Sequence, residues 1–188
     1  MILEYILENK GIDPDKDLTL TTNIAFSSTA GAFAGGIGDY TVEFEPSATA
    51  LEEAGTGFVV ASLGEASGFV PYTVYMATKS YISLYPEIIQ KFTNAIYKGQ
   101  LWVNEHSSAE IAEVIQPHFP ENSIETLTKI VERYKAQDTW KKDPVFEKES
   151  LEHIESIMDF SGELESPVDY ENFVTTIFAE EAMENIGK

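Results

Sequence analysis

Apolar and polar residues alternate in short stretches of the first 76 positions, and each stretch predicts a β-strand. A period of two is typical of a strand with one buried face, and a short apolar run is typical of a strand buried on both faces. Helical or glycine-rich segments separate the stretches, so parallel strands joined by right-handed crossovers are expected. The predicted strands are 18–23, 40–44, 58–61 and 72–76.

From residue 77 onward, apolar residues recur every three or four positions, which is the spacing of amphipathic helices. Pro86 suits the first turn of a helix, and capping-box patterns beginning at Ser107 and Asn122 mark two further helix starts. This region is therefore predicted to be mainly helical. The predicted helices are 86–106, 109–116, 124–134, 147–161 and 170–183.

A short stretch rich in glycine and serine, residues 62–68, separates the two kinds of pattern. Such a composition is typical of a flexible connection. We therefore expect an α/β protein in two parts, a parallel-sheet lobe at residues 1–69 and a mainly helical part at residues 70–188. In parallel sheets, functional side chains gather at the carboxyl ends of the strands. The ends of the first two predicted strands should then share one rim.

The most informative segment follows the first predicted strand and ends just after the second. Ser27 and Ser28 precede the small-residue stretch 29–34, so they can cap a helix whose free N–H groups attract an anion. Helix capping alone is the alternative. Glu45 stands before Pro46, where an acidic residue stabilises the positive end of a helix. If Glu45 faced a ligand instead, its carboxylate would favour a ligand that carries N–H donors or a positive charge.

The charge of the chain limits its partners. The net charge is −20, from 12 Lys and Arg against 32 Asp and Glu. Such a charge repels phosphate backbones and anionic membrane surfaces, so nucleic acid is excluded as a partner. Arg133 is the only arginine, which leaves backbone amides, hydroxyls or lysines to bind any anion. Because cysteine is absent, the sequence excludes disulfides, thiolate metal sites and cysteine nucleophiles.

The sequence carries no motif of a known catalytic, cofactor or metal site. The three histidines lack HExxH spacing, residues 35–39 lack both the complete GxGxxG pattern and the Walker lysine, and no serine lies in a GxSxG elbow. Neighbouring carboxylates, such as those of residues 52–53, fit a solvated helix face better than an acid–base pair. We therefore expect a protein that is not an enzyme and uses neither a cofactor nor a metal.

Taken in order, five segments resemble the soluble binding proteins of ABC importers for nitrate, sulfonates, taurine and thiamine-pyrimidine precursors, which are periplasmic binding proteins of type II. The segments read GIDPDKDLTL, AFSSTAGAFAGGIGDYTVEFEP, GFVVASLGE, VPYTVYMATKSYI and PEIIQKFTNAIYKG. The resemblance implies two α/β lobes that close on a solute, one lobe being inserted within the other. Residues 1–69 would be the inserted lobe without its first strand, and residues 70–188 the returning half of the outer lobe.

The family's N-terminal half, with its signal or lipoprotein segment, has no counterpart in this sequence. The resemblance therefore implies a truncated chain whose full-length form works outside the cytoplasm, in the periplasm or as a membrane-anchored lipoprotein.

The resemblance also implies ligand-binding positions at predicted strand ends and in one loop. Phe44 would stack on a flat ligand, although core packing explains it equally well. Trp140, in the polar loop 137–143, would face the ligand or cover the edge of the core. The implied set is Phe26, Ser27, Ser28, Phe44, Glu45, Tyr72 and Trp140.

The expected function is the capture of a small heteroaromatic or oxoanion solute by lobe closure, followed by recognition by the importer's membrane subunits. A second hypothesis is a fragment that binds no ligand and self-associates, because half an outer lobe leaves apolar helix faces that a homodimer would cover. A third is an enzyme that resembles the synthases of the thiamine pyrimidine precursor. Those synthases carry a cysteine-rich motif, which this chain lacks.

Overall fold

The computed structural model describes residues 1–187, and every regular element in that range is helical. No helix in this range is long and apolar enough to cross a membrane. The elements are α1 (Ile2–Asn9), η1 (Phe26–Ser28), α2 (Thr29–Ala34), α3 (Ser47–Glu53), α4 (Leu63–Ser67), α5 (Lys79–Leu84), α6 (Pro86–Glu105), α7 (Ser108–Ile115), η2 (Gln116–His118), α8 (Ile124–Ala136), α9 (Lys148–Phe160), α10 (Tyr170–Phe173) and α11 (Ile177–Ile186).

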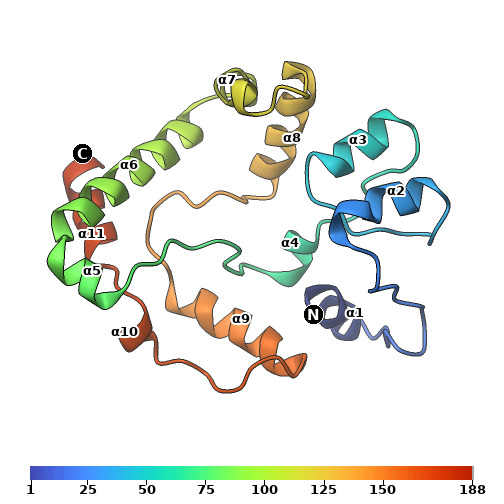
Figure 1. The fold of residues 1–188 in the computed structure, drawn as a ribbon, viewed down its shortest axis with the longest axis horizontal. Coiled ribbons are helices and arrows are strands. Elements are labelled where there is room, and N and C mark those ends of the chain that lie inside the picture. The colour runs from blue at the N-terminus through green and yellow to red at the C-terminus, as the bar shows by residue number, and fades with distance from the viewer. Residues whose placement is uncertain (188) are drawn as a thin grey trace.

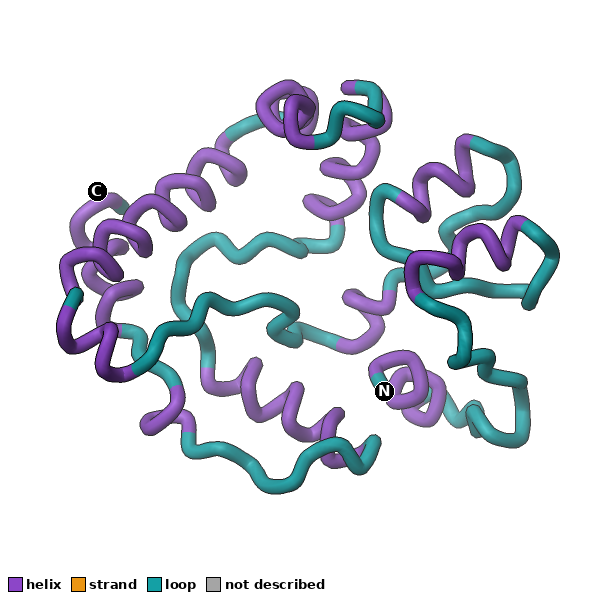
Figure 2. The backbone as a smooth tube through the Cα atoms, viewed as in Figure 1, coloured by secondary structure: helices purple, strands orange, loops and turns teal. Residues whose placement is uncertain are grey.

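The predicted parallel-sheet lobe is wrong. Residues 18–23, 40–44, 58–61 and 72–76 are not helical, but no β-ladder joins any of them within the described chain. Figure 2 shows helices and loops only. Alternation reports the local preference of a segment, whereas a parallel strand also needs a distant neighbour to accept its backbone hydrogen bonds. These segments carry the local signal without such a neighbour.

The helical predictions for the second half were largely correct. In α7, the Ser107 hydroxyl accepts from the N–H of Glu110, and the Glu110 carboxylate accepts from the N–H of Ser107, so the predicted capping box is confirmed. At α8 the cap is Ser123 rather than the predicted Asn122. The predicted helix 170–183 is divided into α10 and α11, because residues 174–176 interrupt the helical backbone.

Helix packing holds the second half of the chain together. Helices α7 and α8 pack around a core of Ala112, Leu127 and Ile130. Helix α11 lies along α6, where the Gln90 side chain donates to the carbonyl of Phe178 at 2.9 Å. Figure 1 shows the helices around the periphery, with the extended segments after α4 and after α8 running through the middle.

Two helix pairs are among the contacts that join the first part of the chain to the second. Helix α1 packs on α9 through Tyr5, whose ring meets the rings of Phe160 and His153 edge-on at 5.6 and 6.1 Å. Helix α3 packs on α8. The division at residues 69 and 70 stays a prediction, and the α3–α8 contact lies beside the candidate site.

Candidate ligand-binding site

Three aromatic rings from separate parts of the chain lie together and remain open to solvent. The ring of Phe44 meets that of Phe26 edge-on and that of Tyr72 at a tilt, with 5.4 Å between centroids in both pairs. Their exposed fractions are 59% for Phe26, 45% for Phe44 and 78% for Tyr72. Contacting rings with free faces can hold a flat ring system by offset stacking. We call these three residues the ring cluster.

The C-terminal half of α8 contributes a phenol beside this cluster. The Tyr134 hydroxyl accepts a hydrogen bond from the backbone N–H of Glu45 at 3.3 Å. Burial raises the pKa of Tyr134; the hydrogen bond from the Glu45 N–H and the charge of Arg133 oppose this, and the carboxylate of Glu45 adds to it, so the pKa stays above its ordinary value. The phenol is therefore neutral at pH 7 and keeps its own proton for donation.

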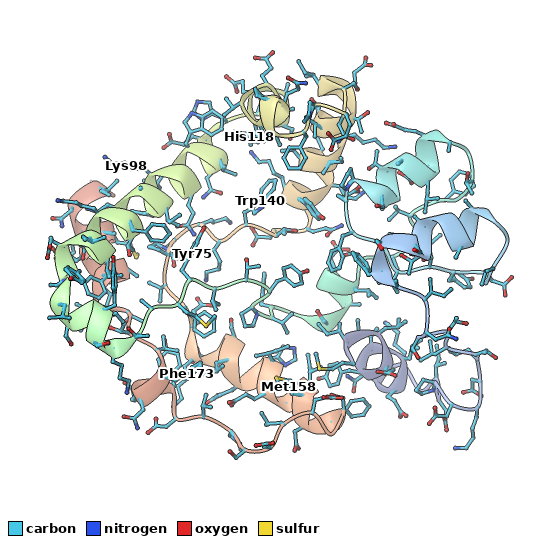
Figure 3. The ribbon with its side chains drawn as sticks, viewed as in Figure 1. Tyr75, Lys98, His118, Trp140, Met158 and Phe173 are labelled. Carbon is cyan, nitrogen blue, oxygen red and sulfur yellow. The ribbon has the colours of Figure 1, made fainter. Side chains whose placement is uncertain are left out.

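Tyr134 contacts both Trp140 and Glu45 and so links the two residues. The ring of Trp140 meets that of Tyr134 edge-on at 5.9 Å. It also lines a shallow cavity of about 260 Å³ together with α6 residues that include Gln100 and Val103. Figure 3 places Trp140 between α6 and α8. The tryptophan thus connects with the ring cluster through Tyr134 and at the same time covers the side of α6.

Glu45 forms a buried ion pair with Arg133. The Glu45 side chain is 5% exposed and that of Arg133 is 20% exposed. One carboxylate oxygen accepts from the Arg133 guanidinium, and the other accepts from the N–H of Thr49 at 3.0 Å. Both oxygens therefore have partners within the chain. The Thr49 bond also satisfies a free N–H in the first turn of α3, although the cap position of this helix is Pro46 rather than the predicted Glu45.

Glu52 shares the same guanidinium. Its Oε2 accepts from Nη2 of Arg133 at 2.6 Å and lies 3.1 Å from the Lys129 ammonium. Its Oε1 accepts from the backbone N–H of Val59 at 3.0 Å. The Val59 hydrogen bond and the Arg133 contact lower the pKa of Glu52 to about 2. Burial alone would lower the pKa of Arg133, but its bonds to Glu52 and Glu45 outweigh burial and raise it.

Ser27 and Ser28 lie in η1, and both are exposed. The cap positions of η1 and α2 are Ala25 and Ser28, and neither cap uses a side-chain hydrogen bond. The predicted capping by the two serines is therefore not made. Helix α2 has six residues, so its dipole is weak as an anion site. The serines lie next to Phe26 in the chain, and their contact with a ligand stays a prediction.

The structure brings together Phe26, Phe44, Tyr72 and Glu45 and connects Trp140 to them through Tyr134. Sequence reasoning missed Tyr134 and the roles of Arg133, Thr49 and Glu52. One signal was present, because the side chains of residues 45, 49 and 52 recur at helical spacing and so share a face. A lone arginine in a strongly acidic chain was the natural partner for that face.

Two of the three histidines make structural contacts through their rings. Nε2 of His153 lies 2.6 Å from the carbonyl oxygen of Ser67, and the ring of His106 stacks on that of Trp102 at 4.1 Å. Among residues 1–187, no group of three or more His, Asp or Glu residues is arranged to hold a metal ion.

Comparison with known proteins identifies the family of the chain. Residues 1–116 match the model of the NMT1-like family. The chain therefore belongs to the NMT1-like family. It is 42% identical, over 180 residues and 96% of its length, to a curated relative named "Putative binding protein YtlA" from Bacillus subtilis (strain 168). The match covers 54% of that relative, so the chain spans about half of its length. No solved structure gave a significant match.

Proposed function

We propose that this chain is the solute-binding part of an importer component and that it holds a small planar heteroaromatic molecule without changing it chemically. The ring cluster carries the proposal, because exposed aromatic faces in mutual contact suit a flat ligand. Membership of the NMT1-like family and a relative named as a binding protein support it.

The charges beside the ring cluster disfavour an oxoanion as the ligand. The guanidinium of Arg133 is already bound to the carboxylates of Glu45 and Glu52, and the chain carries a net charge of −20. An oxoanion would meet repulsion with no free guanidinium to offset it. An aminopyrimidine, such as a thiamine precursor, suits this site better than nitrate, a sulfonate or taurine.

The proposed contacts come from both predicted parts of the chain. Phe26 and Phe44 lie in residues 1–69, whereas Tyr72 and Trp140 lie in residues 70–188. A ligand that contacts both parts stabilises the arrangement in which they are close, and the importer's membrane subunits would recognise that state. In this proposal the full-length protein works outside the cytoplasm, as a periplasmic protein or a membrane-anchored lipoprotein.

A second candidate function is self-association without a ligand. The extended segments after α3 and α4 expose large apolar side chains, and exposed apolar surface favours association. The most exposed are Phe58, Val60, Phe69, Tyr72, Tyr75 and Met76. In this alternative, a homodimer covers these side chains, and the ring cluster is part of its interface.

Two measurements on the whole chain distinguish these functions. Native mass spectrometry reads the oligomeric state together with any retained small molecule. Calorimetric titration then compares the aminopyrimidine precursor of thiamine with taurine and nitrate. We expect saturable binding of the aminopyrimidine alone. Preferential binding of taurine or nitrate would contradict the ligand class, and a dimer that binds none of the three would favour self-association.

A further inference from the structure

Two consecutive residues of α8 hold one residue that precedes α3. Arg133 binds the Glu45 carboxylate, and the Tyr134 hydroxyl accepts the N–H of the same Glu45. Glu45 is thus fixed through its side chain and its backbone at once. Phe44, the central ring of the ring cluster, is the preceding residue, so its backbone position follows that of Glu45.

The same guanidinium reaches further along α3. Nη1 of Arg133 donates to the hydroxyl of Thr49 at 3.2 Å, and Nη2 donates to Glu52. Thr49 is fully buried at this contact. One planar group therefore satisfies three acceptors that extend from Glu45, which precedes α3, to Glu52 near the end of the helix. A lysine ammonium on a flexible stem reproduces this poorly.

Charge makes this arrangement depend on Arg133. Without the guanidinium, the buried carboxylate of Glu45 has no cationic partner among residues 1–187, since the other cation in this network, Lys129, lies against Glu52. An unpaired buried carboxylate is costly, so the region around it moves to reach water. Movement of Glu45 carries Phe44 away from its neighbours Phe26 and Tyr72.

We infer that Arg133 is a positioning residue that fixes α3 on α8 and thereby holds Phe44 in the ring cluster for ligand binding. The inference rests on the proposed function as far as the ligand is concerned. The position of the rings is a property of the free protein and can be measured without any ligand.

The test compares Arg133→Gln with Lys129→Gln in the full chain. Both remove one positive charge from α8, and both remove a partner of Glu52, but only the first affects Glu45. Nuclear Overhauser contacts between the ring protons of Phe44 and Tyr72 report the ring cluster. Titration with the aminopyrimidine precursor of thiamine reports affinity.

We expect Arg133→Gln to lose the Phe44–Tyr72 ring contacts and at least tenfold in affinity, while Lys129→Gln keeps the contacts and binds within twofold of the unchanged chain. Arg133→Lys should recover part of the Phe44–Tyr72 ring contacts and part of the affinity. If folded Arg133→Gln kept the ring contacts, the inference would be overturned even where the melting temperature fell. Should Arg133→Gln not fold, Glu45→Ala replaces it, because it removes both oxygens through which Arg133 and Thr49 hold residue 45. The same loss is then expected, and retention of the ring contacts overturns the inference.

Failure of the proposed function gives a different result. If the unchanged chain does not bind the aminopyrimidine, that ligand is wrong, and the ring contacts still decide whether Arg133 positions Phe44.

Discussion

Arg133 and Glu45 are 88 positions apart in the sequence and form an ion pair in which the carboxylate is almost completely buried. The pair joins the residue before α3 to α8 at the point where Tyr134 also binds Glu45. A long-range contact of this kind connects the first part of the chain with the second, and it lies next to the rings proposed to bind the ligand.

Substitution of Tyr72 by alanine tests the ring cluster directly. Tyr72→Ala removes one stacking face, and we expect about a tenfold loss of affinity for the aminopyrimidine, equivalent to about 1.4 kcal/mol. Tyr40→Ala is a matched control, because Tyr40 is 81% exposed and lies outside the ring cluster. Calorimetric titration of both variants measures the difference, and equal losses would argue against a role for Tyr72 in binding.

The lowered pKa of Glu52 predicts a dependence of stability on pH. The carboxylate titrates near pH 2 in the folded chain, whereas its ordinary pKa is 4.5. Its contribution to the free energy of unfolding is therefore complete above about pH 4.5 and is lost as the pH falls towards 2. Urea unfolding from pH 2 to pH 6 should show the unchanged chain and Glu52→Gln converging at the acidic end. Curves that stay parallel across that range would contradict this origin of the stability.

The capping box of α7 should contribute measurably to stability. Ser107→Ala removes the acceptor for the N–H of Glu110, and we expect a loss of about 1 kcal/mol in the free energy of unfolding. Ser108→Ala is the control, because Ser108 lies inside the helix and is not the cap. Urea unfolding at neutral pH compares the two, and an equal effect would show that the hydroxyl of Ser107 has no special role.

Exposed apolar side chains predict association at raised concentration. Sedimentation velocity of the unchanged chain should show a species larger than the monomer, and its fraction should grow with concentration. Phe58→Ser combined with Val60→Ser should lower that fraction, because both side chains are among the most exposed in the described residues. A monomer at every concentration would refute self-association.

The helices of the second half followed from local signals. Proline at the start of α6 and the Ser107–Glu110 pair at α7 act within one turn, so the sequence around them suffices to place these helices. The predicted strands failed because strand pairing is decided by residues elsewhere. Residues 58–61 have the composition of a buried strand, yet they are extended and exposed, with no neighbouring strand in the described chain.

The candidate site was predictable only as far as local patterns and the family resemblance reach. The strand-end position of Phe44 and the resemblance to importer binding proteins led to three rings that the structure does bring into contact. Arg133 escaped prediction because its partners are far away in sequence. Local patterns show which residues share a face of α3, but not which helix that face meets.

A chain with a single arginine has a single bond that an arginine-specific protease can cleave. Here that bond joins Arg133 to Tyr134, the two residues that hold Glu45. It lies within α8, where a protease can bind the chain only after the helix has opened locally. The rate at which the two fragments appear on a gel therefore measures how often α8 opens around Arg133, the event that would release Glu45. The experiment needs no label.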